Sequence, residues 1–170
     1  HTCARRATGR VYCWGRGSEG QLGNPGGSQS TPVEIAGAST NWSTVVAGDF
    51  HTCGRRITGR LYCWGFDSFG QLGDGGTNTN KNMPVEVVGG ATDWTSFTAG
   101  RNHTCGRRAT GRLYCWGLDS DGQLGDDGTN TDQGAPVEVA GGLTTWTAAP
   151  PAGSTAGATT PSGAWATAAG

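Results

Sequence analysis

Short runs of alternating apolar and polar residues, separated by glycine, proline and polar turns, are the main pattern along this chain. Residues 42–48 read WSTVVAG, 51–56 read HTCGRR, 59–65 read GRLYCWG and 84–88 read PVEVV. Runs of this length that are rich in valine, threonine, tyrosine and tryptophan predict β-strands rather than helices. We therefore expect four short strands in this part of the chain.

The same four-strand pattern occurs three times. HTCARRATGRVYCWG at 1–15 returns as HTCGRRITGRLYCWG at 51–65 and as HTCGRRATGRLYCWG at 103–117, so the period is 50 and then 52 residues. Each copy is followed by GQLG, by a PVE segment and by a tryptophan. A period of about 40–50 residues that carries four strands is typical of a β-propeller blade. The predicted fold class is all-β, a partial β-propeller of about three four-stranded blades.

The second and third strands of each copy form a predicted hairpin that aligns two cysteines. If residues 7–9 form a three-residue loop with Gly9 in the left-handed conformation, Cys3 lies opposite Cys13. The pairs expected from this register are Cys3 with Cys13, Cys53 with Cys63 and Cys105 with Cys115. Opposed positions suit disulfides, with buried free thiols and a metal site as alternatives. Three disulfides would indicate an oxidising compartment, so the expected location is secreted or at the cell surface.

Composition narrows the classes of function. Glycine contributes 32 of 170 residues and only 34% of residues are hydrophobic, which disfavours long helices. The 12 basic and 13 acidic residues leave no net bias toward nucleic acids. No apolar run approaches the ~20 residues of a membrane-spanning helix. We expect no nucleic-acid partner and no membrane insertion.

Three arginine clusters could still line a basic stripe that attracts polyanions. They are Arg5, Arg6 and Arg10, then Arg55, Arg56 and Arg60, then Arg107, Arg108 and Arg112. No aromatic residues interleave with these arginines, and charge on outer strands discourages pairing between sheets. We interpret the clusters as solubilising charge paired with acidic loops.

The elements HTC, YCWG, GxxGQLG, PV and AG at a period near 51 resemble the regulator-of-chromosome-condensation type repeat over residues 1–147. The resemblance implies a β-propeller, usually of seven blades. The family pattern does not require the paired cysteines, which look like a feature of its secreted bacterial members. The family includes exchange factors for a nuclear GTPase and a secreted bacterial inhibitor of β-lactamases. No partner-specific loop matches here, so neither activity is carried over to this chain.

Two motifs suggest chemistry but repeat in ways that favour structure. His1, His51 and His103 hold the same position in every copy, as expected of a repeated structural hydrogen bond and not of a single catalytic base. The stretch DSDGQLGDDGTNTD at 119–132 superficially resembles a calcium-binding loop, but the first copy reads GSE at 17–19. We expect no catalytic residue, no metal site and no cofactor.

The copies differ mainly in their loops, which are the expected recognition elements of a repeated scaffold. The candidate partner-binding residues are Phe50, Phe66, Phe69, Lys81, Arg101, Asn102 and Asp121. The predicted function is a non-enzymatic extracellular or cell-surface scaffold that binds a protein partner through these loops. One alternative is a fragment of a larger propeller, or a decayed gene product without activity of its own. A second is part of a polysaccharide-acting enzyme.

The end of the chain departs from the repeats. Residues 1–50, 51–102 and 103–149 are interpreted as three repeats, and residues 150–170 as a disordered tail. Codons for PPAGSTAG, read one base earlier, can encode ATGRLYCWG. We therefore hypothesise that the tail is the next repeat translated out of frame, with an ordinary linker as the alternative.

The number of blades also bears on association. Three blades cannot close a seven-bladed ring, so the end blades should expose faces that promote self-association. Because the chain opens inside a repeat at His1, we expect it to be a piece of something longer or a processed product.

Overall fold

The computed structural model describes residues 1–147 as β-strands joined by turns and loops, which confirms the all-β prediction. Within these residues there is no helix, and hence none long and apolar enough to cross a membrane. The predicted disordered tail and the out-of-frame hypothesis concern residues 150–170, which lie outside the described residues.

The strands form three antiparallel sheets, in each of which they lie in sequence order. The first sheet contains β1 (Thr2–Arg5), β2 (Val11–Gly15) and β3 (Gln29–Glu34). The second contains β4 (Trp42–Ala47), β5 (His51–Arg56), β6 (Leu61–Gly65) and β7 (Lys81–Glu86). The third contains β8 (Trp94–Ala99), β9 (His103–Arg108), β10 (Leu113–Gly117) and β11 (Gln133–Glu138).

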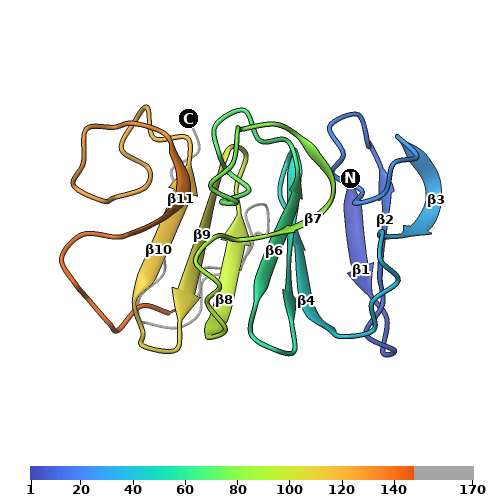
Figure 1. The fold of residues 1–170 in the computed structure, drawn as a ribbon, viewed down its shortest axis with the longest axis horizontal. Coiled ribbons are helices and arrows are strands. Elements are labelled where there is room, and N and C mark those ends of the chain that lie inside the picture. The colour runs from blue at the N-terminus through green and yellow to red at the C-terminus, as the bar shows by residue number, and fades with distance from the viewer. Residues whose placement is uncertain (148–170) are drawn as a thin grey trace, which may run out of the picture.

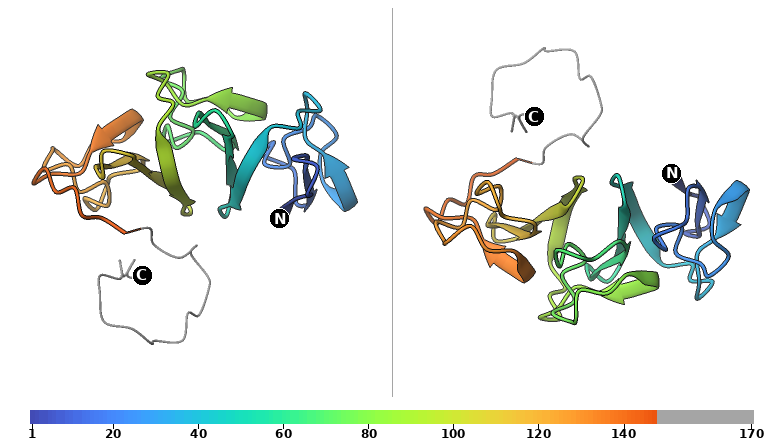
Figure 2. Two further views of the ribbon diagram at one scale, coloured as in Figure 1. Left: turned by 90° about the horizontal axis from the view of Figure 1, so that it is seen from below. Right: turned by 90° about the horizontal axis from the view of Figure 1, so that it is seen from above.

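The three sheets stand next to one another as blades that fan around a common axis (Figure 2). β4 and β8 lie on the concave side of the fan and contact each other. β4 is therefore the first strand of the sheet that contains the hairpin β5–β6, and β8 is the first strand of the sheet that contains the hairpin β9–β10. The first sheet begins at β1 and has three strands, because no counterpart of β4 precedes it among the described residues.

The two edges of the fan differ in their loops (Figure 1). The tight hairpin turns, such as residues 57–59, lie at the lower edge. The upper edge, called the loop face below, carries the connections at 16–28, 48–50, 66–80, 100–102 and 118–132. These are the segments in which the three copies diverge most.

The hairpin register agrees with the prediction from glycine spacing. Gly9 has a φ of 81°, and a side chain there would also collide with the carbonyl oxygen of Thr40, so only glycine fits this turn. Across the hairpin, Cys3 lies directly opposite Cys13, and the other two hairpins repeat this pairing. The predicted three-residue loop is thus confirmed.

The apolar core lies between blades, not within a single sheet. One cluster combines Val11, Cys13, Leu22 and Ile35 of the first blade with Trp42 and Trp64 of the second. The next cluster combines Cys53, Leu61, Cys63, Leu72 and Val87 of the second blade with Trp94 and Trp116 of the third. The second and third blades thus each bury two tryptophans against the preceding blade, and burial of such large side chains dominates the packing energy. Trp42, Trp64, Trp94 and Trp116 therefore anchor neighbouring blades to one another.

Candidate functional site

The six cysteines form three disulfides, Cys3–Cys13, Cys53–Cys63 and Cys105–Cys115. The Cα atoms of each pair are 4.1 Å apart, because the paired strands hold them at directly opposed positions. No free cysteine remains, and in the described part of the chain no group of three or more His, Cys, Asp or Glu residues could hold a metal ion. The disulfide prediction is therefore confirmed over its free-thiol alternative.

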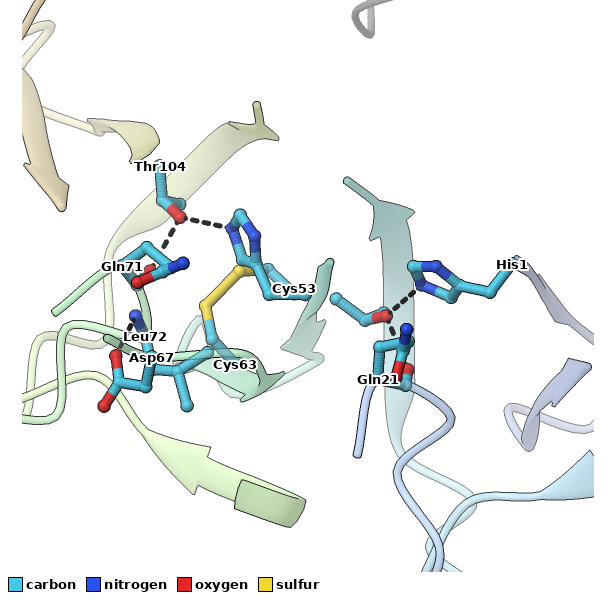
Figure 3. Close-up of a disulfide and its surroundings, with 10 residues drawn as sticks. His1, Gln21, Cys53, Cys63, Asp67, Gln71, Leu72 and Thr104 are labelled. Carbon is cyan, nitrogen blue, oxygen red and sulfur yellow. Dashed lines mark hydrogen bonds between the residues drawn. A yellow bond between two sulfur atoms is a disulfide. The ribbon is translucent and has the colours of Figure 1, made fainter. Parts of the chain in front are cut away.

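A hydrogen-bond relay crosses each junction between blades (Figure 3). The hydroxyl of Thr52 donates to the carbonyl oxygen of Gln21 at 2.8 Å, and Nε2 of His1 lies 2.7 Å from the same hydroxyl oxygen. At the next junction Thr104 donates to the carbonyl oxygen of Gln71 at 2.8 Å and contacts His51 at 2.8 Å. The relay links residues about 50 apart in sequence through the repeated His-Thr pair.

The relay fixes the protonation of its histidines. Since the Thr104 hydroxyl hydrogen is used on Gln71, Nε2 of His51 must donate, and the buried Nδ1 carries no proton. Complete burial, with a smaller contribution from the charge of His103, lowers the pKa of His51 to about 3. Burial lowers the pKa of His103 in the same direction. His1 and His51 make structural hydrogen bonds to the threonine of the next blade, as their periodicity suggested.

The relay gives the fold a dependence on pH. The unfolded chain takes up a proton at His51 below about pH 6.5 while the folded chain does not, so stability present above that pH falls as the pH is lowered toward 3. Between pH 7 and pH 5, protonation of His51 in the unfolded state alone should cost about 2 kcal/mol of stability. Urea unfolding at both pH values measures this loss.

Asp67 changes the stability in the opposite direction on acidification, so a variant at this position serves as a control for the effect of His51. Burial raises its pKa to about 6, so the folded chain binds a proton more tightly there and gains stability as the pH falls from 6. The Asp67→Asn variant keeps the oxygen that accepts from the amide of Leu72 at 2.9 Å but removes this gain. It should lose more stability than the wild type on acidification, and equal losses would contradict the assignment.

Arginine side chains of the three clusters make ion pairs, ring contacts and hydrogen bonds within the fold. Arg10, Arg60 and Arg112 pair with Glu34, Glu86 and Glu138 at 3.1, 2.7 and 2.9 Å. Arg56 stacks 4.8 Å from the ring of Trp42 and 4.6 Å from that of Tyr62. Arg55 donates to the carbonyl oxygen of Trp94 in the next blade at 2.8 Å. The pairing with acidic residues agrees with the interpretation, although the partners lie on strands as well as in loops.

The acidic motif of the third blade builds a turn. Oδ1 of Asp119 accepts from the amide of Leu124 at 2.9 Å, and the amide of Asp119 donates to Asp132 at 2.9 Å. Asp67 makes the same contact with Leu72 in the second blade. In the first blade the position is Gly17, where a Cβ atom would lie 2.3 Å from the carbonyl oxygen of Gly27. The carboxylates that resembled a calcium loop therefore support chain reversal.

The loop face carries a cluster of aromatic and guanidinium groups that is not repeated. The ring of Phe66 lies 6.1 Å from that of Phe50 and 6.0 Å from that of Phe69, both edge to face. Arg16 from the first blade and Arg101 from the third stand over Phe50 at 5.4 and 5.7 Å. We call these five residues the Phe–Arg cluster. All three phenylalanines are partly exposed.

Repeat register shows that the blade fold does not require this cluster. The counterparts of Phe66 are Arg16 and Leu118, and those of Phe69 are Glu19 and Asp121. Since the other blades fold with charged or aliphatic residues at these positions, packing alone does not explain the phenylalanines. An exposed feature that departs from the repeat is the strongest candidate for recognition.

Four of the seven candidate loop residues meet in the cluster, together with Arg16, which was not predicted. Arg16 could have been found, because it replaces an apolar residue of the later copies. The other three make different contacts. The ammonium of Lys81 lies 3.4 Å from Asp74, the carbonyl of Asn102 accepts from the amide of Leu118, and the amide of Asp121 donates to Gln123.

These blades and their junctions define the chain as a segment of a β-propeller. The regulator of chromosome condensation (RCC1) repeat model matches residues 8–54, 58–106 and 110–149, and a second model of the same repeat matches residues 42–71 and 94–123. The chain belongs to the RCC1 repeat family. No curated protein matches it significantly in sequence.

Solved structures share the fold at low sequence identity. Prp20p of Saccharomyces cerevisiae, described with its binding to Gsp1p and histones, is 19% identical with a TM-score of 0.71 over 81% of this chain. Yeast RCC1 (Prp20) bound to Kap60 is 20% identical, with a TM-score of 0.72 over 81% of this chain. Human WBSCR16 is 19% identical, with a TM-score of 0.67 over 78% of this chain. The chain spans 35%, 34% and 35% of these proteins, respectively, about a third of their length.

Proposed function

We propose that this chain is a non-enzymatic propeller scaffold that binds a protein partner through the loop face of its second blade. The observation that carries the proposal is the Phe–Arg cluster, in which residues of three consecutive blades meet on the face where the copies diverge. Aromatic residues and arginine are enriched at the centres of protein interfaces and supply most of their binding energy.

The solved relatives support the same class of function. The yeast protein Prp20p is described as binding Gsp1p and histones, and as being bound by Kap60. Their low identity supports only the general role, since the same fold carries many functions. The partner of this chain is therefore argued from its own loops.

We further propose that the scaffold works in an oxidising environment, secreted or at the cell surface. All six cysteines are paired in disulfides, and such bonds persist outside the reducing cytosol. The remaining candidate residues, Lys81, Asn102 and Asp121, lie in or beside the loop-face connections and would contribute to the rim of the contact.

The test replaces the cluster with loop residues that this chain already uses. The double variant Phe66→Leu/Phe69→Asp converts the second loop into the LDSDGQLG of the third blade, so it should fold normally. Partners captured from the extracellular medium by the wild type are identified and purified, and their affinity is measured by calorimetry. We expect the double variant to bind at least about tenfold more weakly.

Ile57→Ser is the matched control, because Ile57 is 72% exposed in the turn between β5 and β6, at the opposite end of these strands from the loop-face connections. It should bind like the wild type. A partner that binds the double variant as tightly as the wild type would place recognition elsewhere and refute the proposal.

A further inference from the structure

The Phe–Arg cluster brings two guanidinium groups to one aromatic ring. The Cζ atoms of Arg16 and Arg101 lie 5.4 and 5.7 Å from the centroid of the Phe50 ring. Both arginines are exposed, and Arg101 forms no ion pair within residues 1–147. Two positive charges near one ring repel each other, so a negative group bound between them would be attracted by both.

Contacts from two blades hold Arg16 in position. Its Nε donates to the hydroxyl of Ser18 at 2.8 Å, and its Nη2 lies 3.3 Å from Oε1 of Glu19. The other carboxylate oxygen of Glu19 accepts from the side-chain amide of Asn80, in the loop of the second blade, at 2.9 Å. The guanidinium is therefore oriented before a ligand binds, which reduces the entropy lost on binding.

An apolar surface lies beside the two arginines. The rings of Phe66 and Phe69 pack edge to face, and both are partly exposed. Phe50 contacts Phe66 as well as the two guanidinium groups, so the charged and apolar parts of the cluster are continuous. A ligand that contacts both parts needs a negative group next to an apolar one. An acidic residue adjacent to a large apolar residue has this chemistry.

The loop that follows Arg101 disfavours a polyanion. The amide of Leu118 donates to the carbonyl oxygen of Asn102 at 2.9 Å, so the loop at 118–132 begins beside the cluster. None of its aspartates forms an ion pair within residues 1–147. Its exposed carboxylates are Asp121, Asp127 and Asp132. This loop would repel a nucleic acid, a sulfated polysaccharide or an anionic membrane, whereas a single carboxylate would contact the arginines alone.

We propose that the Phe–Arg cluster binds a peptide segment of its partner in which an aspartate or glutamate is adjacent to a large apolar residue. The carboxylate pairs with Arg16 and Arg101 beside Phe50, and the apolar side chain packs against Phe66 and Phe69. Arginine suits this role, because its planar guanidinium binds a carboxylate through two parallel hydrogen bonds. The inference rests on the proposed function, since it names the chemistry of the partner that the loop face would bind.

A peptide library tests this chemistry without a known partner. Random short peptides displayed on phage are selected on the wild type, and those that also bind Phe66→Leu/Phe69→Asp are removed. We expect the enriched sequences to carry Asp or Glu adjacent to an aliphatic or aromatic residue.

A double-mutant cycle on the strongest peptide then tests the pairing with arginine. Replacing its acidic residue with the corresponding amide should weaken binding by about tenfold, and Arg101→Gln should weaken binding of the acidic peptide by about fivefold. Arg101→Gln should have little effect on the amide peptide, because the ion pair is already lost. Arg16→Leu, which introduces the residue that the third blade has at this position, should also weaken the acidic peptide. Calorimetry measures each affinity.

Arg6→Gln is the matched control. Arg6 is exposed, and its Cζ stands 5.8 Å from the centroid of the Tyr12 ring, so the variant loses the same charge and the same kind of contact. Arg6 lies in the turn between β1 and β2, at the opposite end of these strands from the loop-face connections. It should bind the peptide like the wild type.

The outcomes separate this inference from the proposed function. Enriched peptides that need the phenylalanines but contain no acidic residue, or whose affinity is the same for Arg101→Gln, would overturn the inference and leave the proposed function standing. Heparin that binds the wild type and not Arg101→Gln would identify a polyanion site and also overturn it. If no peptide prefers the wild type to the phenylalanine double variant, the inference fails, and the affinity of the captured partner decides the proposed function separately.

Discussion

Replacing Trp64 with alanine should cost about 4 kcal/mol of stability, the largest effect expected of any single side chain in the first junction. Trp64 is fully buried between the first and second blades, where its ring packs 5.8 Å from that of Trp42. Its indole also donates to the carbonyl oxygen of Gln21. Loss of the ring would leave a cavity that neighbouring strands cannot fill, because both sheets are held by their own ladders.

Trp14→Ala is the matched control for this prediction. It removes the same side chain from the same repeat position, but Trp14 has no preceding blade to pack against among the described residues. Its cost should therefore stay below about 1 kcal/mol. Urea unfolding followed by circular dichroism gives both values. Equal losses at the two positions would show that the junction is not the main source of stability.

Replacing Cys53 and Cys63 together with alanine should cost about 3 kcal/mol. The disulfide closes a loop with a sequence separation of 10, and the chain-entropy model assigns nearly this amount to a loop of that length. The bond also lies fully buried within the second core cluster, so its removal loosens packing around Leu61 and Leu72. Thermal and urea unfolding of the double variant measure the loss.

The Cys3→Ala/Cys13→Ala variant separates these two contributions. Its loop has the same separation of 10, so the entropic part should be equal. Cys3 is partly exposed, whereas Cys53 is fully buried, so the pair in the first blade should cost less. A larger loss at Cys3 and Cys13 than at Cys53 and Cys63 would contradict the packing argument.

The repeat made most of the fold predictable. Placing Gly9 in the left-handed conformation predicts the strand register of the first hairpin, in which Cys3 lies opposite Cys13. The turn spacing is identical in every copy, so the same register predicts the other two disulfides. The His–Thr relay was not predictable in the same way. Periodicity indicated that His51 makes a structural hydrogen bond, but its partner Thr104 is 53 positions away, and only the packing of neighbouring blades brings the two together.

Four of the five residues of the Phe–Arg cluster were predicted as candidates from the sequence, but their contacts with one another were not. Divergence from the repeat identified Phe50, Phe66 and Phe69 one by one, whereas their stacking depends on how loops from adjacent connections fold back. Lys81 was a candidate for the same reason, yet Asp74 lies beside its ammonium. Sequence divergence indicates where selection for structure is relaxed, and the side chains that meet there follow from loop geometry.

The His–Thr relay makes every boundary between units chemically interchangeable. The threonine of each unit bonds to the preceding unit, and its histidine bonds to the threonine of the following unit. Adding or deleting one whole unit of about 50 residues therefore leaves the hydrogen-bond donors and acceptors matched at the remaining boundaries. Gene duplication can therefore change the length of such an array without a compensating change in its core. The loops are then free to evolve new specificities one unit at a time.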